Sequence, residues 1–226
     1  MERQRLVVAI DGPSGSGKST VARGVARALG LRYLDTGAMY RAITWLALRS
    51  GIDLDRAQDL TDLAEHADLV VATDPVAPRI CADGTDLTDA VRSADVTAAV
   101  SAVSAVPGVR RAMIAGQRRL IGDGGIVVEG RDIGTTVVPN AAVKIFLTAD
   151  SLTRAARRSR QVGAGDAAGT LAATEADLNR RDAADSGRAA SPLRQALDAL
   201  VIDSSALPVE DVIQVVVDHA HSATTR

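Results

Sequence analysis

Residues 6–20 read LVVAIDGPSGSGKST and mark the start of an α/β unit. The first five of these residues form a continuous apolar run without alternation, which predicts a strand buried on both faces of a parallel sheet. After the run, apolar residues recur at helical intervals from Val21 to Leu29, and Gly30 follows, a residue type that favours a helix C-terminus. The pattern therefore predicts a strand, a glycine-rich loop and a helix in direct succession.

The predicted loop matches the phosphate-binding pattern G-x-x-x-x-G-K-[ST] from Gly12 to Ser19. Glycines allow the backbone to wrap around a phosphate with several N–H groups pointing inward. Lys18 is expected to reach the β- and γ-phosphates of ATP, and Ser19 to offer its hydroxyl to Mg²⁺. The residues predicted to bind ATP are Gly12, Ser14, Gly15, Ser16, Gly17, Lys18, Ser19 and Thr20.

The composition of the chain excludes some classes of protein. With 226 residues, a formal net charge of -2 and a pI near 5.9, the chain lacks the basic excess of proteins that bind polymeric nucleic acid. It contains no long apolar run and no charged-then-apolar leader, so we expect no membrane partner and a cytoplasmic location. We expect one domain, since a chain of this length can bury a single sizeable core, and we take it to be a monomer.

Short apolar runs and turn signals predict the remaining elements. Between about residues 66 and 90, extended runs flank Asp83-Gly84, a pair typical of a tight hairpin, so we expect a small β insert there. Further strands are expected at 33–34, 126–128, 143–147 and 199–202, and helices at 39–49, 93–105, 108–121, 170–182 and from about Pro208.

An arginine-dense helix is predicted to begin near Ser151, which can cap it. Arg154, Arg157 and Arg158 fall on one face of this helix by the i, i+3, i+4 rule. Gly163–Gly169 is expected to form a mobile loop after it. Guanidinium groups on a segment that closes can stabilise charge on a transferring phosphoryl group, so Arg157 and Arg158 are candidate catalytic residues.

A phosphate-binding loop alone is compatible with GTPases, ATPases and small-molecule kinases. Guanine-specific switch proteins normally carry an Asn-Lys-x-Asp segment, and Lys18 and Lys144 are the only lysines, so a signalling GTPase is the weakest rival. A motor ATPase or helicase would need larger domains. A kinase of a small acceptor is favoured, and a module that uses bound nucleotide only as a switch remains an alternative.

The distribution of arginines favours an acceptor that is itself a phosphate monoester. The second pKa of such an acceptor, about 6, leaves its attacking oxygen largely ionised at neutral pH, so no strong general base is needed. The site must instead offset the repulsion between two phosphates, for which bidentate arginines are suited. Candidates that follow a strand, a helix start or the glycine-rich segment are Arg41, Arg131, Arg181 and Arg188.

Several separated motifs form a recognisable set. They are GPSGSGKS at 12–19, LDTGAMYR at 34–41, GRDIGT at 130–135 and the charged segment Arg181–Arg188. In order and spacing this set resembles bacterial cytidylate kinase, and the resemblance spans essentially the whole chain. It implies transfer of the γ-phosphoryl group of ATP to CMP and dCMP, with kinases of UMP, AMP or shikimate as alternatives.

The resemblance also implies a fold. It is an α/β fold of the P-loop NTPase type, with a three-layer core around a parallel sheet. The core would comprise residues 1–61, 96–151 and 169–226, with a small β insert for monophosphate binding at about 62–95. A short helical lid at about 152–168 would carry the arginines between 154 and 160.

Roles for individual residues follow from the same resemblance. Thr36, Arg41 and Arg131 would hold the acceptor phosphate. Arg181 and Asp185 would lie at the sugar hydroxyl and phosphate, and Arg188 at the phosphate and base edge. Ser101, Arg110 and Asp132 would read cytosine. The catalytic set would be Lys18, Asp132, Arg157 and Arg158.

For two carboxylates, Asp132 and Glu129, the sequence leaves a second interpretation open. Asp132 could serve only to orient Arg131 through a local ion pair. Glu129 stands where the family often has Asp before Gly-Arg-Asp, which lengthens the side chain by one methylene. A role for Glu129 in ordering the water ligands of Mg²⁺ is therefore open, and the alternative is a helix-cap or surface carboxylate.

Overall fold

The computed structural model describes residues 5–162, 171–188 and 190–224. Its central sheet has the strand order β2-β6-β1-β7-β8, and all neighbouring strands are parallel. The strands are β1 (Val7–Asp11), β2 (Arg32–Asp35), β6 (Ile126–Gly130), β7 (Val143–Thr148) and β8 (Leu200–Asp203). The parallel sheet that the apolar runs predicted is thus confirmed, with the strand at residues 6–10 in its centre.

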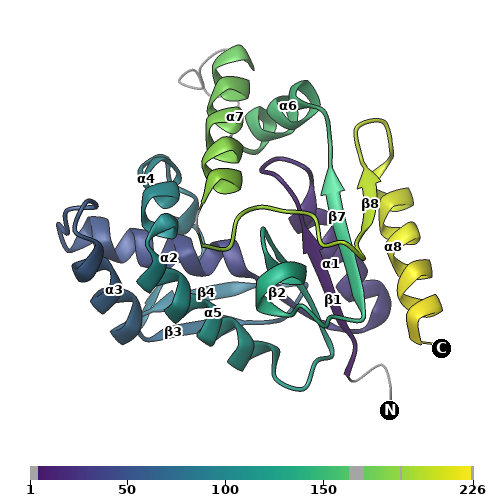
Figure 1. The fold of residues 1–226 in the computed structure, drawn as a ribbon, viewed down its shortest axis with the longest axis horizontal. Coiled ribbons are helices and arrows are strands. Elements are labelled where there is room, and N and C mark those ends of the chain that lie inside the picture. Colours follow the sequence, from purple (N-terminus) through teal and green to yellow (C-terminus); the bar gives the residue numbers. More distant parts are fainter. Residues whose placement is uncertain (1–4, 163–170, 189, 225–226) are drawn as a thin grey trace.

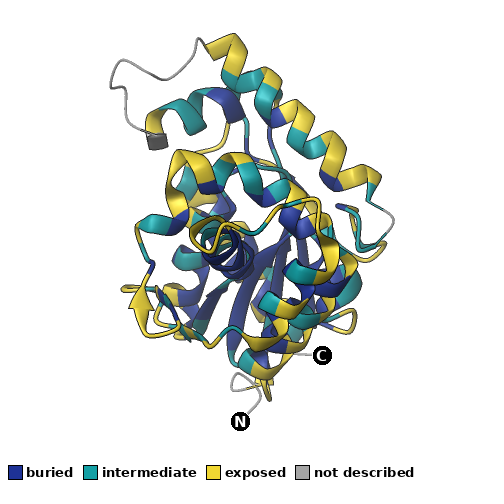
Figure 2. Cartoon of the chain, turned by 90° about the vertical axis from the view of Figure 1, so that its left-hand side faces the viewer, coloured by how far each residue is buried: buried dark blue, intermediate teal, exposed yellow. Residues whose placement is uncertain are grey.

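Helices cover both faces of this sheet, which makes three layers (Figure 1). On one face, α1 (Lys18–Leu29) and α8 (Val209–Thr224) pack on Val8 and Ile10. On the other face, α2 (Thr36–Arg49), α3 (Ala57–His66), α4 (Ala94–Ala105) and α5 (Pro107–Ile121) form a second core with Ala9. Successive strand residues point to opposite faces, so one apolar run serves both cores. Figure 2 shows the buried residues gathered in these strands and on the inward faces of the helices.

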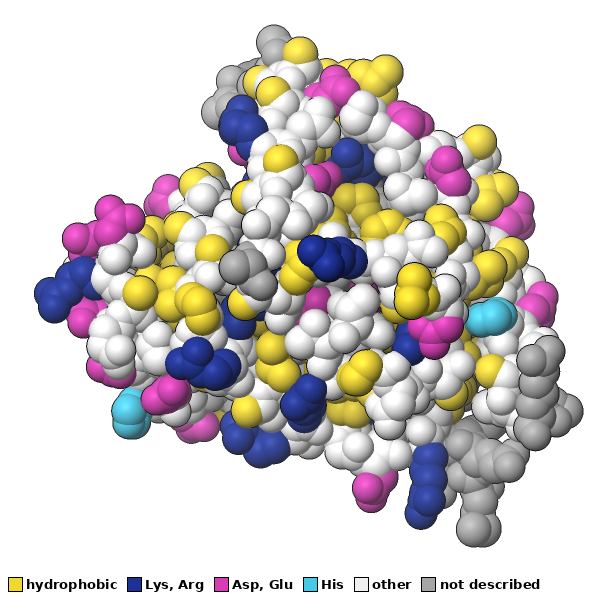
Figure 3. Space-filling view, viewed as in Figure 1, with side chains coloured by type: hydrophobic (Ala, Val, Ile, Leu, Met, Phe, Trp, Pro, Cys, Tyr) yellow, Lys and Arg dark blue, Asp and Glu magenta, His cyan; other side chains and the backbone are white. Residues whose placement is uncertain are grey.

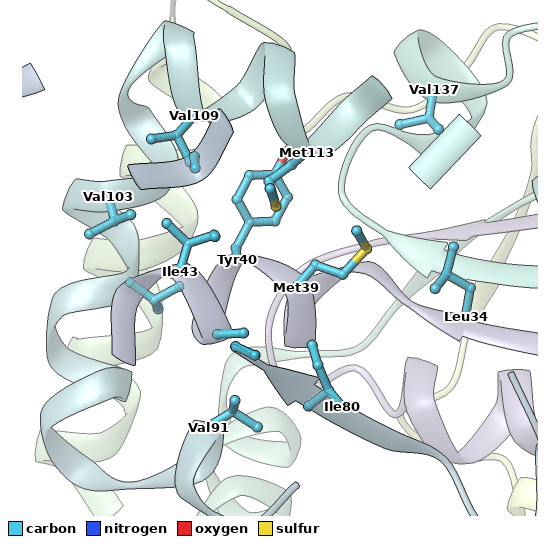
Figure 4. Close-up of a cluster of buried hydrophobic side chains, with 14 of the residues drawn as sticks. Leu34, Met39, Tyr40, Ile43, Ile80, Val91, Val103, Val109, Met113 and Val137 are labelled. Atoms are coloured by element: carbon cyan, nitrogen blue, oxygen red, sulfur yellow. The ribbon is translucent and has the colours of Figure 1, made fainter. Parts of the chain in front are cut away.

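The core under α2 and α5 reaches the edge of the candidate site through Tyr40. Figure 4 shows its ring beside Met113, with Ile43 and Val109 close by. Tyr40 is buried, yet its hydroxyl has no hydrogen-bond partner within the part of the chain that the structure describes. The apolar core therefore ends here in a polar group beside the site.

The predicted small β insert is present as a separate antiparallel sheet with the order β3-β4-β5. Its strands are β3 (Leu69–Ala72), β4 (Arg79–Ala82) and β5 (Thr85–Asp86). Asp83 and Gly84 have φ angles of 48° and 76°, which the two-residue hairpin turn requires. The Arg23 guanidinium on α1 donates to the Pro75 and Val76 carbonyls at 2.9 and 3.0 Å, which ties the insert to the core.

The helices α6 (Ser151–Val162) and α7 (Leu171–Gly187) pack on each other above the carboxyl ends of the strands (Figure 1). The sequence predicted that α7 would end near residue 182, but it continues to Gly187, because Ala183 and Ala184 favour helix and Asp185 pairs with Arg188. The predicted mobile loop Gly163–Gly169 lies outside the described residues.

The start of α2 also differs from the prediction, which placed it at Met39. The Asp35 carboxylate accepts a hydrogen bond from the Ala38 N–H at 3.0 Å, so the helix begins at Thr36. Thr36 therefore lies in the first turn, at the positive end of the helix dipole.

Charges of both signs are interspersed over the face shown in Figure 3, without a single-sign field. Among the described helices, none combines the length and apolar character needed to cross a membrane.

Candidate active site

The backbone of the glycine-rich loop depends on two of its glycines. Gly12 has a φ of 151°, and a Cβ atom there would meet the Leu147 carbonyl oxygen at 2.0 Å. Gly15 has a φ of 79°, and a Cβ atom there would lie 2.9 Å from the Arg154 carbonyl oxygen. Strand β7 and helix α6 thus approach the loop so closely that only glycine fits, which leaves the loop backbone free to surround a phosphate.

Lys18 is buried at the start of α1, and its ammonium group donates to the Pro13 carbonyl at 2.7 Å. Burial, together with the nearby Arg131, lowers the pKa of Lys18 to about 7, against the opposing effect of Glu129 and Asp11. A bound phosphate would supply the negative charge that this ammonium group lacks. The position and environment of Lys18 therefore fit a ligand of the nucleotide phosphates.

Asp11, which the sequence did not single out, fixes the segment after Asp132. Its carboxylate accepts hydrogen bonds from the Ile133 and Gly134 N–H groups, both at 2.8 Å. Burial raises the pKa of Asp11 to about 6, although these hydrogen bonds oppose the shift. Asp11 thus connects the end of β1 to the turn that carries Arg131 and Asp132.

Glu129 is not a surface or helix-cap carboxylate: it lies in β6, only 4% exposed, and accepts a hydrogen bond from the Tyr33 hydroxyl. Burial raises the pKa of Glu129 to about 7, with a further contribution from the Asp35 charge. Ser19 lies beside the same pair, since its hydroxyl interacts with both Glu129 and Tyr33.

The donor set around Ser19 fits Mg²⁺ that is bound together with phosphates. Within the described residues, no group of three or more His, Cys, Asp or Glu side chains could hold a metal alone. Mg²⁺ is usually held by one or two protein oxygens, waters and substrate phosphates. The Ser19 hydroxyl, with Glu129 and Asp35 near enough for water-mediated contacts, matches that pattern.

A cavity of about 200 Å³ opens from the glycine-rich loop toward α4, α5 and α7. It brings together every residue that was predicted to bind the acceptor: Thr36, Arg41, Ser101, Arg110, Arg131, Asp132, Arg181, Asp185 and Arg188. Lys18 and Ser19 line it as well. The cavity therefore joins the predicted phosphate donor site to the predicted acceptor site.

We call the side of this cavity formed by Ser101, Ser104, Arg110, Asp132 and Arg188 the base end. Arg110 is 3% exposed and donates to the Asp132 carboxylate at 2.6 Å. The partner of Asp132 is thus Arg110, and the alternative of a local ion pair with Arg131 is wrong, since the Arg131 Nε atom bonds Asp185 at 2.8 Å.

Further contacts fix the guanidinium groups of the base end. Arg110 lies 5.3 Å from the centroid of the Tyr40 ring and donates to the Ser104 carbonyl at 3.3 Å. Arg188 pairs with Asp185 and donates to the Ser104 hydroxyl at 2.9 Å. Ser101 lines the cavity beside them. Neither Tyr40 nor Ser104 was predicted from the sequence, because each acts through the side chains that it holds.

We call the opposite side, formed by Thr36, Arg41, Arg131, Arg158 and Arg181, the phosphate end. Burial lowers the pKa of Arg41 to about 10, and the charges of Arg181 and Arg158 lower it further. Burial and the neighbouring Arg131 likewise lower the pKa of Arg181. Mutual repulsion among buried guanidinium groups marks a site whose missing partner is an anion.

Besides Arg131, which bonds Asp185, two further residues of the phosphate end already have partners. The Thr36 hydroxyl donates to the Glu129 carbonyl at 2.7 Å. One nitrogen of Arg41 donates to the Thr97 hydroxyl at 3.1 Å. Arg41 still lines the cavity with the rest of its guanidinium group, but the Thr36 hydroxyl proton is engaged.

The arginines of α6 have different partners, although the sequence placed them on one face. Arg158 reaches the phosphate end of the acceptor cavity. Arg157 donates to the Ser204 carbonyl at 2.6 Å and to the Ser16 carbonyl at 3.3 Å, on the other side of the glycine-rich loop. Side chains at i and i+1 point about 100° apart around a helix, so adjacent arginines diverge.

Arg154 connects α6 and α7 to the glycine-rich loop. It pairs with Asp182 of α7 and donates to the Ser14 carbonyl at 3.2 Å, while the Ser14 N–H donates to Asp182 at 3.2 Å. One loop N–H group therefore has a carboxylate partner from α7 in this structure.

A second cavity, of about 310 Å³, lies on the side of the loop that Arg157 faces. Beside Gly15, Gly17 and Thr20, its lining contains Arg160 and residues near the start of α8: Ser204, Leu207, Val209 and Val212. This part of the site was not predicted, because 204–212 carries no motif and reaches the loop only through the pairing of β8 with β7.

Comparison with known proteins agrees with this geometry. The family model for cytidylate kinase matches residues 8–222. The cytidylate kinase of Streptomyces griseus subsp. griseus is 52% identical over 95% of this chain and 92% of its own length. That of Rhodococcus opacus is 51% identical over 94% of this chain and 93% of its own length.

A solved structure of an uncharacterized protein from Eubacterium ventriosum supports the fold alone, with a TM-score of 0.54 and 10% identity over 96% of this chain and 99% of that chain. The match of a cytidylate kinase family model to residues 8–222 and the identity of about half of the sequence to these relatives lead to one conclusion. This chain belongs to the cytidylate kinase family.

Proposed function

We propose that this protein transfers the γ-phosphoryl group of ATP to CMP and dCMP, giving CDP or dCDP and ADP. One observation carries the proposal: a single cavity connects Lys18 to the arginines of the phosphate end and then to the Arg110–Asp132 pair. The cavity thus offers positive charge to the phosphates of the donor and of the acceptor, and hydrogen-bonding groups to the base.

On the donor side, the backbone from Gly12 to Ser19 surrounds the ATP phosphates, and Lys18 contacts the β- and γ-phosphates. The 310 Å³ cavity suits the ATP nucleoside, because it adjoins the loop and the apolar side chains of Leu207, Val209 and Val212 form part of its lining. Arg157 lines this cavity and donates to the Ser16 carbonyl, so its guanidinium group is suited to contact ATP.

On the acceptor side, Arg41, Arg131 and Arg181 bind the CMP phosphate and offset its repulsion from the γ-phosphate. The acceptor oxygen is already ionised at neutral pH, so no side chain must remove a proton from it. Arg158 enters from α6 at the same end, where its guanidinium group can stabilise charge that builds up on the transferring group.

The Ser19 hydroxyl, with Glu129 and Asp35 through water, would hold Mg²⁺. Held there, Mg²⁺ would neutralise part of the charge of the phosphates. Tyr33 donates to Glu129 and thereby orients its carboxylate toward this position.

The base end discriminates through its hydrogen-bonding groups. Cytosine carries an amino donor at position 4 and an acceptor at ring nitrogen 3, whereas uracil has the opposite arrangement. Asp132 accepts from the amino group, and Arg110 donates to the base. With two mismatches, CMP should exceed UMP in catalytic efficiency by about 30-fold to 10⁴-fold.

We further propose that the core (1–61, 96–151 and 169–226) carries the ATP site, that the insert at about 62–95 covers the monophosphate, and that the lid at about 152–168 closes over the phosphates. The positions of Arg41, Arg92 and Arg158, which all line the acceptor cavity, support this division. All groups named for the reaction come from one chain, so a monomer suffices.

An assay that couples ADP release to a detectable signal tests the function, with ATP, Mg²⁺ and in turn CMP, dCMP, UMP, AMP and GMP. We expect rapid turnover of CMP and dCMP and weak turnover of the others. Preference for UMP or AMP would assign a different acceptor. Nucleotide binding without ADP release in the presence of any monophosphate would indicate a binding module.

A further inference from the structure

Arg92 lies at the junction between the insert and α4, and its backbone is firmly held. It ends the short 3₁₀ helix η2 (Ala90–Arg92), in which the neighbouring Val91 is only 2% exposed. The Arg92 N–H donates to the Asp89 carbonyl at 3.0 Å, and Ser93 then caps α4 by accepting from the Val96 N–H at 3.5 Å. The side chain therefore projects from a fixed point beside the acceptor cavity.

The side chain of Arg92 is held far less firmly than its backbone. Its Nη2 atom lies 3.7 Å from the Asp35 carboxylate, and the side chain is 66% exposed. A contact of that length with an exposed guanidinium group is no hydrogen bond and contributes little to stability. Arg92 can thus leave Asp35 at small cost when a stronger anion is near.

The charge of Arg92 acts on the phosphate end. Its guanidinium group lines the 200 Å³ acceptor cavity and also a larger cavity of about 800 Å³ between α1 and the insert, so it lies at their common border. The pKa of Arg158 is lowered first by burial, then by Arg181 and then by Arg92. Arg92 contributes in the same direction to the lowered pKa of Arg41.

Another arginine of the insert, Arg79, provides a comparison. It lies on β4 and lines only the larger cavity. Of these two arginines of the insert, Arg92 therefore faces the phosphate end and Arg79 does not.

We propose that Arg92 is a further ligand of the acceptor phosphate, which moves from Asp35 to that phosphate when CMP binds. The inference rests on the proposed function, because it assigns a residue to the acceptor side of the same reaction. Arg92 would bring a charge from the insert to a cluster otherwise built from the core and the lid. Its departure would also free the Asp35 carboxylate beside the proposed Mg²⁺ position.

The origin of Arg92 in the insert decides which kinetic constant it affects. Both arginines line both cavities, but Arg158 comes from α6 and is half-buried, whereas Arg92 comes from the insert and its side chain is 66% exposed. An interaction made equally in the substrate complex and in the transition state changes KM and leaves kcat nearly constant. Loss of Arg92 should therefore raise KM for CMP.

The test compares Arg92→Ala and Arg92→Lys with the matched control Arg79→Ala. For Arg92→Ala we expect KM for CMP to rise by about 10-fold to 100-fold while kcat changes by less than about threefold. Arg92→Lys should recover part of the loss, because lysine keeps the charge but not the bidentate geometry. Arg79→Ala should keep the wild-type KM.

Binding of cytidine, which lacks the phosphate, separates a phosphate ligand from a structural residue. Titration calorimetry should show that Arg92→Ala weakens CMP binding and leaves cytidine binding unchanged. Equal losses for CMP and cytidine, or a KM equal to that of Arg79→Ala, would overturn the inference while wild-type turnover of CMP keeps the proposed function intact. A wild-type protein that releases no ADP with CMP would overturn both.

Discussion

The two ends of the acceptor cavity differ in how their charges are balanced. At the base end, Arg110 pairs with Asp132 and Arg188 pairs with Asp185 before any ligand is bound. At the phosphate end, Arg131 also pairs with Asp185. The other three arginines there, Arg41, Arg158 and Arg181, make no ion pair with any residue that the structure describes. Both arginines of the base end thus have a carboxylate partner, whereas three of the four arginines of the phosphate end have none among the described residues.

From this difference we infer which property of the enzyme each end of the cavity controls. Prearranged hydrogen-bonding groups discriminate between bases, because a wrong base leaves buried polar groups unpaired. Unbalanced guanidinium groups bind and stabilise phosphate charge but cannot tell one base from another. We expect substitutions at the phosphate end to change rate or affinity, and substitutions at the base end to change specificity.

The largest effect should come from Lys18, which serves the phosphates from the donor side. Lys18→Ala should lower kcat by about 10³-fold or more, because its charge acts on the transferring group. The free energy of unfolding should stay equal or rise, since burial of this ammonium group is unfavourable, as its lowered pKa shows. ADP release and thermal unfolding are the measurements.

Lys144, the other lysine of the chain, is the matched control. It pairs with Asp198 at 2.8 Å, away from the acceptor cavity. Lys144→Ala should lower stability and keep kcat. A folded Lys18→Ala protein with near-normal turnover would contradict the role of the glycine-rich loop.

Arg158 should show the next largest effect. Arg158→Ala should lower kcat by about 10²-fold and change KM for CMP much less, the sign of an interaction made in the transition state. Arg157→Ala should act chiefly on KM for ATP, because Arg157 faces the donor cavity and Ser16. Steady-state kinetics with each substrate varied in turn separate the two. Equal effects of both variants on the CMP constants would place both arginines at the acceptor.

Asp11 connects the two ends through the turn at residues 133–134, and its effect should be visible in stability. Its pKa is raised from 3.8 to about 6, so the folded state binds its proton more tightly than the unfolded state does. Stability must then fall as pH rises from about 4 to 6 and remain lower above that range. Relative to Asp11→Asn, the wild type should lose about 2–3 kcal/mol between pH 4 and pH 7.

Denaturant unfolding of both proteins at a series of pH values measures this loss. A stability difference that stays constant from pH 4 to pH 7 would show that the Asp11 carboxylate is not perturbed.

The smallest of these changes concerns the base end. Asp132→Asn should narrow the ratio of CMP to UMP catalytic efficiency by about 10-fold, because the amide can donate to the uracil oxygen. If Asp132 only held Arg110, the efficiencies for both substrates would fall by one factor and the ratio would stay the same. Competition between CMP and UMP at a fixed ATP concentration gives the ratio directly.

Much of the site could be predicted from the sequence because its residues lie in local motifs. Gly12–Ser19 carries its own strand and helix context, and Arg41 and Arg131 follow strand ends that a parallel sheet brings to one edge. The same rule that predicts the sheet therefore predicts that these residues converge. The resemblance to a known family added the base-reading set.

The unpredicted part depends on contacts between distant segments. Arg157 turns to Ser204 because β8 pairs with β7, a register that no local pattern contains. The burial of Glu129 and its bond to Tyr33 follow from the pairing of β2 with β6. Arg92 follows no motif, and only the position of the insert beside the cavity makes it a candidate.

The ion pairs of the base end are made without a phosphate, so we expect the two ends of the cavity to bind the base and the phosphate independently. Titration calorimetry gives dissociation constants for CMP, UMP, cytidine and uridine with the wild-type protein. If the base end is arranged before the phosphate binds, the preference for cytidine over uridine should equal that for CMP over UMP within about twofold. Equal affinities for cytidine and uridine, beside a clear preference for CMP over UMP, would show that the phosphate arranges the base end and would contradict the account.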